Sequence, residues 1–276
     1  MPRDVGDVLA TYEIEGDSYS GMAWSEGYLW LIYWWNFTLI KYDINTQQIV
    51  ESYGIHNEPY GMAWDGQYFW IGTSDFGTVI RGYDTQGNLI GDFNGPHDHW
   101  PGITWDGQYL WLSEADCMSN PLLYQVDVDG TVIRTLSSNL NGETATGLAW
   151  TEEHEEGQLW ISGWVYNSIH QVDISGDIAV SIESFTSPTY DVLCAFTHDG
   201  TDLWILGNSG SIYQIDDGIE EQSTLDWLTC PEGPGTIPAG SSQDFNCVFD
   251  ATDQNGGDYS ADIVITSNDP DENPVI

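Results

Sequence analysis

The chain has 276 residues, of which 41% are hydrophobic and 13% aromatic, a composition that excludes intrinsic disorder and allows a large core. Its 44 acidic residues and four Lys and Arg give a net charge of −40, which argues against nucleic acid or an anionic membrane as a partner. Such self-repulsion is most tolerable in salt or with bound divalent cations, so we expect a secreted or cell-surface protein. No apolar run is long enough to span a membrane, and the first residues, MPRDVGDV, lack a signal-peptide apolar region. We therefore expect that any export signal has been removed.

One sequence motif recurs five times along the chain. The copies are GMAWSEGYLW from Gly21, GMAWDGQYFW from Gly61, GITWDGQYLW from Gly102, GLAWTEEHEEGQLW from Gly147 and the worn LCAFTHDGTDLW from Leu193. Their spacing of about 40 to 46 residues is typical of propeller blades. Each copy is followed by an alternating strand that ends in Asp, and the first four also by a polar turn and another strand. Four short strands per repeat predict an all-β fold built from β-propeller blades.

The fifth repeat stops after SIYQID and lacks a fourth strand. The stretch VLATYEIEG, residues 8–16, matches the fourth-strand pattern and precedes the first repeat. We expect it to pair with the last blade, because a closed ring leaves no unpaired strand edge. The sequence thus predicts a five-bladed propeller over residues 1–217.

Two sets of aromatic residues recur once per repeat at fixed positions. The first set ends the innermost strands and comprises Trp24, Trp64, Trp105, Trp150 and a substitute, Phe196. The second set lies in the second strands and comprises Trp30, Trp70, Trp111, Trp160 and Trp204. Large rigid rings repeated in this way predict packing between neighbouring blades.

Four other tryptophans break the repeat and fall in loops that emerge opposite the tight hairpins. With nearby polar and aromatic residues they predict a ligand-binding surface. Its candidate residues are Trp34, Trp35, Asn36, Tyr60, Asp75, His97, His99, Trp100, Trp164, Tyr166 and Asn167. The alternative is that these long loops fold over the ring and bury their own aromatic side chains.

The GxAWDGxxLW repeats over residues 8–217 resemble those of secreted bacterial five-bladed propellers of the glutamine cyclotransferase type. This resemblance implies the architecture. No position matches a catalytic glutamate context of the cyclotransferases. The tail, with GTIPAGSSQDFNCVFDAT and YSADIVITSNDPDENPVI, resembles bacterial immunoglobulin-like modules, and we assign residues 218–276 to such a module.

This module is shorter than expected, with three predicted strands and the start of a fourth, where a sandwich has about seven. Either the chain continues beyond Ile276, or a neighbouring molecule adds a strand and the protein self-assembles. Cys230 and Cys247 lie on two predicted strands and favour a disulfide in an oxidising compartment. We expect Cys194 in the core, at the position of Met22, and Cys117 in a loop as a free or packed thiol.

Metal binding is an alternative that the sequence leaves open. His56, His97 and His99 on one rim would suit a transition metal, although isolated loop histidines are commoner. Two oxygen-rich segments have calcium-like spacing but also suit ordinary turns. They are Asp127, Asp129 and Gly130, and Asp250, Asp253, Asn255 and Asp258. We assign no metal ligands, and calcium remains an alternative cofactor.

For function, we favour a recognition or adhesion module that binds glycan or protein through the aromatic face. An enzyme acting on polysaccharide, as a lyase or hydrolase, or a cyclotransferase-like enzyme, is the first alternative. Its acid and base would come from the loop carboxylates Glu58, Asp75, Glu114, Asp116 and Asp191. Because no Ser-His-Asp order, phosphate loop or metalloprotease motif is present, we assign no catalytic residue. A structural subunit that assembles through the C-terminal module is the second alternative.

Overall fold

The computed structural model describes residues 4–56, 58–73, 78–97, 102–114, 121–152, 154, 157–189, 195–207, 209–218, 228–229 and 247–249. The chain divides into two compact units, Met1–Glu221 and Gln222–Ile276. Within the described ranges the structure is almost entirely β, and the one helix there is the short 3-10 turn η1 (Trp34–Asn36). No helix in those ranges is long and apolar enough to cross a membrane.

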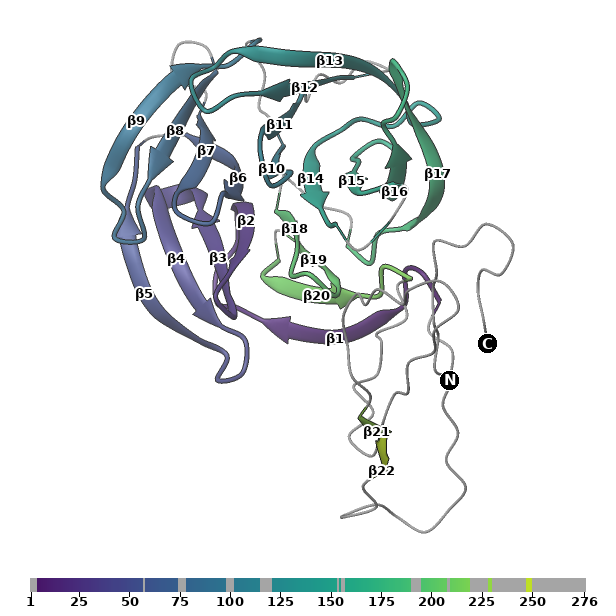
Figure 1. The fold of residues 1–276 in the computed structure, drawn as a ribbon. Helices are drawn as coiled ribbons and strands as arrows, with labels where there is room; N and C mark the ends of the chain where they lie inside the picture. The colour runs from purple at the N-terminus through teal and green to yellow at the C-terminus, as the bar shows by residue number, and fades with distance from the viewer. Residues whose placement is uncertain are drawn as a thin grey trace, which may run out of the picture. The chain divides into compact units, whose positions relative to one another are not determined.

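The first unit consists of antiparallel groups of four strands arranged around an axis, as in a β-propeller (Figure 1). We number these groups in chain order. The first is β2 (Tyr19–Ser25), β3 (Tyr28–Tyr33), β4 (Thr38–Asp43) and β5 (Gln48–Gly54); the second is β6 (Pro59–Trp64), β7 (Phe69–Thr73), β8 (Val79–Tyr83) and β9 (Leu89–Asn94). The third is β10 (Ile103–Trp105), β11 (Leu110–Ser113), β12 (Leu122–Val126) and β13 (Val132–Asn139); the fourth is β14 (Gly147–Trp150), β15 (Leu159–Ser162), β16 (Ser168–Asp173) and β17 (Ile178–Thr186). The fifth is β18 (Phe196–His198), β19 (Leu203–Leu206), β20 (Ser211–Ile215) and the N-terminal β1 (Val8–Glu13). The second unit contains β21 (Leu228–Thr229) paired with β22 (Val248–Phe249).

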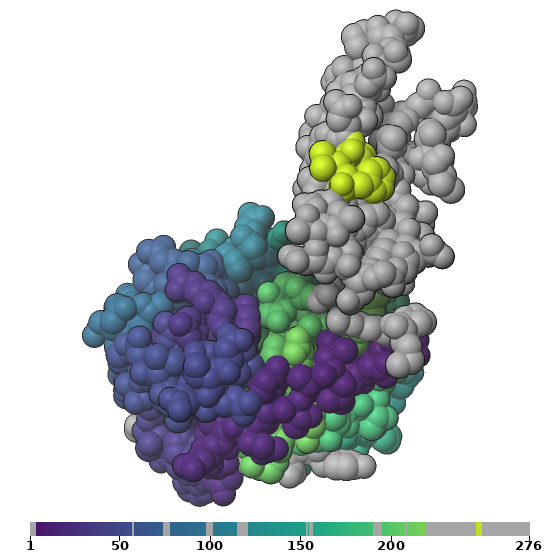
Figure 2. Space-filling model, turned by 90° about the horizontal axis from the view of Figure 1, so that it is seen from below, coloured from purple at the N-terminus to yellow at the C-terminus, as the bar shows by residue number. Residues whose placement is uncertain are grey.

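The two ends of the first unit meet in the fifth group. Strand β1 pairs antiparallel with β20, from Val8 opposite Ile215 to Glu13 opposite Ser211. Figure 2 shows β1 as a purple band beside the green strands of this group. The innermost strands also contact one another in sequence, and β18 contacts β2. The predicted pairing of the N-terminal strand is therefore confirmed, and the ring is closed.

The third and fourth groups are joined more tightly than the others. Their outermost strands, β13 and β17, pair in parallel, with Ser137 opposite Ile178 and Asn139 opposite Val180. This pairing merges the two groups into one eight-stranded sheet. The connection from β13 to β14, which leads from one group to the next, lies directly after this paired segment.

The hydrophobic core lies between neighbouring groups. Trp24 of the first group stacks on Trp204 of the fifth, with ring centroids 5.6 Å apart, and Trp150 of the fourth stacks on Trp111 of the third at 6.5 Å. The five second-strand tryptophans are buried, as predicted, and they are Trp30, Trp70, Trp111, Trp160 and Trp204. These rings fill the wedge between adjacent sheets, which is why the repeat requires them.

The Asp of the repeated WDG turn explains why this motif recurs. In the second group, one Asp65 oxygen accepts the backbone N–H of Gln67 and of Tyr68, both at 2.7 Å. The other oxygen accepts the indole N–H of Trp70 at 2.7 Å. Equivalent bonds link Asp106 to Trp111 and Asp199 to Trp204. One carboxylate thus closes the hairpin and satisfies a buried indole donor.

The fifth group corrects one assignment made from sequence. His198 pairs with Leu203, as Trp64 pairs with Phe69, whereas Phe196 pairs with Ile205, as Met62 pairs with Ile71. His198, and not Phe196, therefore occupies the inner tryptophan position.

The same register places Phe196, and not Cys194, at the position of Met22, two residues before the inner tryptophan position. The ungapped match of HDGTDLW with WDGQYFW carries this register. Aligning Phe196 with the inner tryptophans shifted the fifth repeat by two positions.

Candidate functional site

The loop between β15 and β16 presents three consecutive apolar side chains to solvent. Trp164, Val165 and Tyr166 are 54%, 52% and 65% exposed. In an extended strand, side chains alternate between the two faces, so one of three neighbours would normally point inward. This loop is therefore built to turn all three outward.

The backbone amides of the same three residues point inward. Trp164 N–H donates to Thr144 Oγ1 at 2.9 Å, Val165 N–H to Glu143 Oε1 at 2.6 Å, and Tyr166 N–H to Glu143 Oε2 at 2.7 Å. Successive amides that converge in this way form a concave anion-binding nest. Here the anion is a side chain of the protein itself.

Glu143, in the connection between β13 and β14, is fully buried. It also accepts the Thr144 N–H at 2.9 Å and the Ser168 hydroxyl at 3.0 Å. Burial alone would raise the pKa of Glu143, but the hydrogen bonds from Thr144, Tyr166, Val165 and Ser168 outweigh it and hold that pKa below its ordinary value. The carboxylate is consequently ionised at neutral pH.

A line of hydrogen bonds extends from Glu143 to the outermost strand. Ser168 Oγ lies 2.8 Å from His170 Nε2, and His170 Nδ1 lies 2.9 Å from Ser181 Oγ. Burial lowers the pKa of His170, against the opposing effect of the Glu143 charge, so the ring is neutral at pH 7. Because Glu143 only accepts, we assign Ser168 as its donor and His170 Nε2–H as donor to Ser168. The Ser181 hydroxyl then donates to His170 Nδ1 at 2.9 Å rather than to the Glu183 carbonyl at 3.2 Å.

Asn167 does not belong to the exposed surface, although the sequence suggested it. It is buried and adopts a left-handed backbone with φ of 56°. Its side-chain amide donates to the Ser187 carbonyl at 3.0 Å. Asn tolerates this conformation better than most residues, so Asn167 shapes the end of the loop.

The corresponding loop of the first group contains η1. Trp34 is half-buried and packs edge-on against Trp35 at 5.1 Å and Phe37 at 6.4 Å. Its indole N–H is buried with no hydrogen-bond partner among the described residues. Trp35 is 62% exposed, and exposed Asn36 bonds to Thr38. The loop presents one ring and uses the other as its anchor.

The other predicted surface residues are less prominent. Tyr60 is half-buried, and half-buried His97 lies against Tyr124 with ring centroids 5.4 Å apart. Asp75, His99 and Trp100 lie outside the described residues. Among the described residues, the exposed aromatic side chains of the predicted face are Trp35, Trp164 and Tyr166, which we name the aromatic surface.

The described residues of the alternative metal sites make other contacts and are not brought together as metal ligands. His56 Nδ1 lies 2.9 Å from the Tyr83 hydroxyl, and the carboxylates of Asp127 and Asp129 accept amides of their own turn. Across the described ranges, no group of three or more His, Cys, Asp or Glu is placed to hold a metal ion. The second predicted segment, Asp250, Asp253, Asn255 and Asp258, lies outside those ranges.

The loop carboxylates and cysteines are only partly described. Glu58 is exposed and Glu114 is half-buried, whereas Asp116 and Asp191 lie outside the described residues. Cys247 is disulfide-bonded. The remaining cysteines, Cys117, Cys194 and Cys230, also lie outside the described residues.

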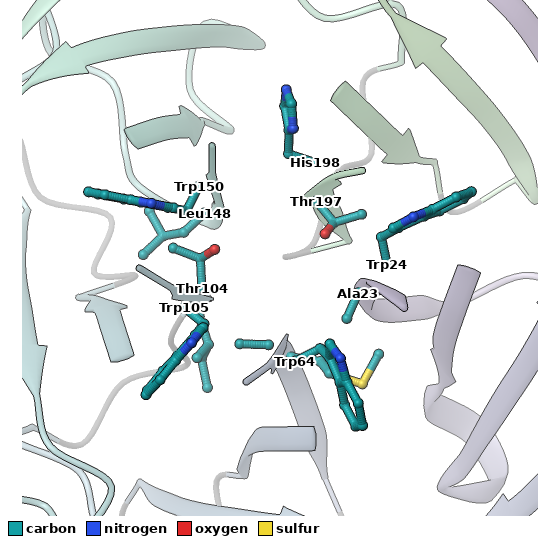
Figure 3. A pocket seen from close by; sticks show the side chains of 12 residues that line it. Ala23, Trp24, Trp64, Thr104, Trp105, Leu148, Trp150, Thr197 and His198 are labelled. Carbon is teal, nitrogen blue, oxygen red and sulfur yellow. The ribbon is translucent and has the colours of Figure 1, made fainter. Parts of the chain in front are cut away.

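A small cavity lies on the axis, at the hairpin ends of the inner strands. Figure 3 shows Trp24, Trp64, Trp105, Trp150 and His198 around it, each from a different strand. Its volume of about 90 Å³ is far below the roughly 300–1,000 Å³ of typical small-molecule sites. We therefore place the candidate site at the loop end of the ring.

His198 is held in this wall by both ring nitrogens. The Gly200 backbone N–H donates to Nδ1 at 2.9 Å, so the proton lies on Nε2, which donates to buried Asp217 at 2.8 Å. His154 Nε2 lies 3.1 Å from the same carboxylate oxygen. A histidine bonded in this way has no free nitrogen to act as a base or a metal ligand.

Glu143 is the residue that sequence reasoning missed. It lies in NGETATG, a polar stretch between blades, and looks like any other of the 44 acidic residues. A signal was present in Gly163, since GWVYN begins with a residue that tolerates close approach. Only the fold shows that these two segments meet.

Comparison with known proteins supports the fold. No protein-family model matches the chain, and no curated protein matches it. Among solved structures, it is similar to glutaminyl cyclase from Myxococcus xanthus, with 15% identity, a TM-score of 0.59 and coverage of 77% of this chain and 96% of that one. The luciferin-regenerating enzyme matches with 9% identity, a TM-score of 0.52 and coverage of 75% and 95%. At such identities these likenesses show the fold alone, an all-β, β-propeller-type architecture.

Proposed function

We propose that the chain is a five-bladed β-propeller over residues 1–217, followed by an immunoglobulin-like module over residues 218–276. Five four-stranded groups support the blade count, as do the contacts that link each inner strand to the next and the last to the first. The disulfide bond of Cys247 supports a secreted or cell-surface location, because such bonds persist in oxidising compartments.

We propose further that the propeller is a recognition module that binds neutral glycans through Trp35, Trp164 and Tyr166. The observation that carries this proposal is the loop at Trp164–Tyr166, where buried polar groups hold exposed apolar side chains outward. A flat aromatic ring with a polar tip suits a sugar, which has an apolar C–H face and a polar rim. The net charge of −40 disfavours acidic polysaccharides.

Affinity electrophoresis against matched neutral and uronic-acid-containing polysaccharides tests this proposal. We expect retardation by neutral polysaccharides, weakened at least about tenfold by Trp164→Ala or Tyr166→Ala, since buried interface anchors typically contribute about 2 kcal/mol or more. Ile182→Ala is the matched control, because this β17 side chain is similarly exposed but does not belong to the aromatic surface. Absence of binding, equal binding of acidic polysaccharides, or an unchanged Trp164→Ala variant would contradict the proposal.

The fold is also compatible with the enzyme alternative, since enzymes are among the similar structures. The same experiment separates the two, because an enzyme would shorten or modify the polysaccharide during the run. Turnover that is lost on replacing Glu58 or Glu114 would favour the enzyme.

A further inference from the structure

The loop between β15 and β16 is built around a carboxylate. The amides of Val165 and Tyr166 each donate to a different oxygen of Glu143, and the preceding Trp164 amide donates to the adjacent Thr144 hydroxyl. Because an amide and the side chain of its residue leave the backbone in different directions, drawing three successive amides inward sends the three side chains outward. The exposure of the rings is thus a consequence of the bonds to residues 143 and 144.

Gly163 shows how closely the loop fits this carboxylate. A Cβ added at Gly163 would lie 1.9 Å from Glu143 Cγ and 2.2 Å from its Cδ. A side chain at position 163 would require Glu143 to move, so the loop can approach the carboxylate this closely only through glycine. The Glu143 side chain fills the space that any other residue would need.

The connection that carries Glu143 is largely buried. In the connection, Leu140, Thr144 and Ala145 are almost fully buried, whereas Asn141 is exposed and Gly142 is half-buried. The parallel pairing of β13 with β17 fixes the start of this connection. Motion of Glu143 relative to the fourth group is therefore restricted, and the hydrogen bonds to Glu143 restrict the motion of the loop in turn.

We propose that Glu143 is a positioning residue for two residues of the aromatic surface: its carboxylate occupies an anion-binding nest in the loop and thereby sets the outward display of Trp164 and Tyr166. This inference rests on the proposed function for its effect on binding. Its effect on the loop itself needs no ligand. The nest should also accept a small carboxylate from solution once the side chain is removed.

Chemical rescue of Glu143→Gly tests the proposal. In the full chain, this variant should exchange the amide hydrogens of Val165 and Tyr166 at least about tenfold faster and bind neutral polysaccharide at least about tenfold more weakly, since about 1.4 kcal/mol corresponds to tenfold. Sodium formate should restore much of the amide protection and of the polysaccharide binding, relative to sodium chloride at the same ionic strength. Glu152→Gly, an exposed acid in the same group, controls for loss of charge and for added glycine.

Gly163→Ala provides a second route if Glu143→Gly does not fold. Its methyl group displaces the carboxylate, so it should accelerate the same two amides without any change of charge. Formate that acts no better than chloride, or unchanged exchange at Val165 and Tyr166 in both variants, would overturn the positioning role. If exchange changes as expected but Trp164→Ala leaves glycan binding intact, the proposed function fails and the positioning of the loop stands.

Discussion

The two aromatic loops at the same end of the ring are held by opposite kinds of force. In the first group, a half-buried indole, Trp34, packs against its neighbours and supports exposed Trp35. In the fourth group, a buried carboxylate accepts the amides beneath Trp164 and Tyr166. Apolar packing is insensitive to pH and tolerates small shifts, whereas a buried charge fixes direction and responds to protons. Both loops thus display aromatic rings outward, but only the loop of the fourth group should be sensitive to pH.

The largest difference should appear on removing each anchor. We expect Glu143→Ala to lower the free energy of unfolding by about 3 kcal/mol or more, because several buried donors lose their acceptor at once. Urea denaturation measures this loss. Glu152→Ala, at an exposed position of the same group, should change it by about 0.5 kcal/mol or less. Similar losses in the two variants would mean that the buried network contributes little.

Removing the apolar anchor should cost less. We expect Trp34→Ala to lower the free energy of unfolding by about 2 kcal/mol, below the usual cost for a fully buried tryptophan, because the side chain is half-buried and its N–H is unsatisfied. Trp35→Ala is the matched control one residue away and should change stability little. If the two substitutions destabilise the protein equally, Trp34 is not the anchor of this loop.

Acidification should separate the loops without any substitution. The pKa of His170 is lowered in the folded protein, so below the ordinary value of 6.5 the unfolded chain binds more protons. The stability from neutral His170 is complete above that value and is lost as pH falls toward the lowered pKa.

The pKa of Glu143 is also lowered, and its contribution is lost as pH falls below the ordinary value of 4.5. Amide exchange at Val165 and Tyr166, corrected for intrinsic rates, should therefore accelerate from pH 7 to 4, while exchange at Phe37 stays constant. If amide exchange accelerates equally in both loops, the two loops do not differ in their sensitivity to pH. His170→Gln should flatten the part of the profile near pH 6, since the amide can replace both hydrogen bonds.

The smallest effect concerns the displayed rings. Trp164→Ala and Tyr166→Ala should each change the free energy of unfolding by about 0.5 kcal/mol or less, since both side chains are more than half exposed. Thermal melting of the two variants beside the Trp70→Ala variant, whose ring is buried, checks this expectation. A loss as large as that of Trp70→Ala would make these rings part of the core.

The sequence by itself determined the repeated architecture. The period of the tryptophan motif, the Asp-Gly turns and the four-strand pattern are local signals, and the pairing of β1 with β20 followed from one missing strand. It also indicated that the second-strand tryptophans are structural, because a residue repeated in every blade has the same environment in each. Trp34, Trp35 and Trp164 depart from that repeat, which left open whether they are exposed or buried; Trp35 and Trp164 are exposed, and Trp34 is half-buried.

Only the tertiary structure decided how the loops are held. Glu143 and the loop at Gly163 lie about twenty residues apart and share no pattern, so their contact depends on how the third and fourth groups pack. The parallel pairing of β13 with β17 and the burial of Asn167 likewise depend on neighbours that are distant in the chain. The register that places His198 among the inner tryptophans was, by contrast, already present in the sequence, in the ungapped match of HDGTDLW with WDGQYFW. A repeated motif predicts local structure because each copy has the same environment. The role of a single buried charge cannot be predicted in this way, because its protonation and hydrogen bonds depend on residues that only the fold brings around it.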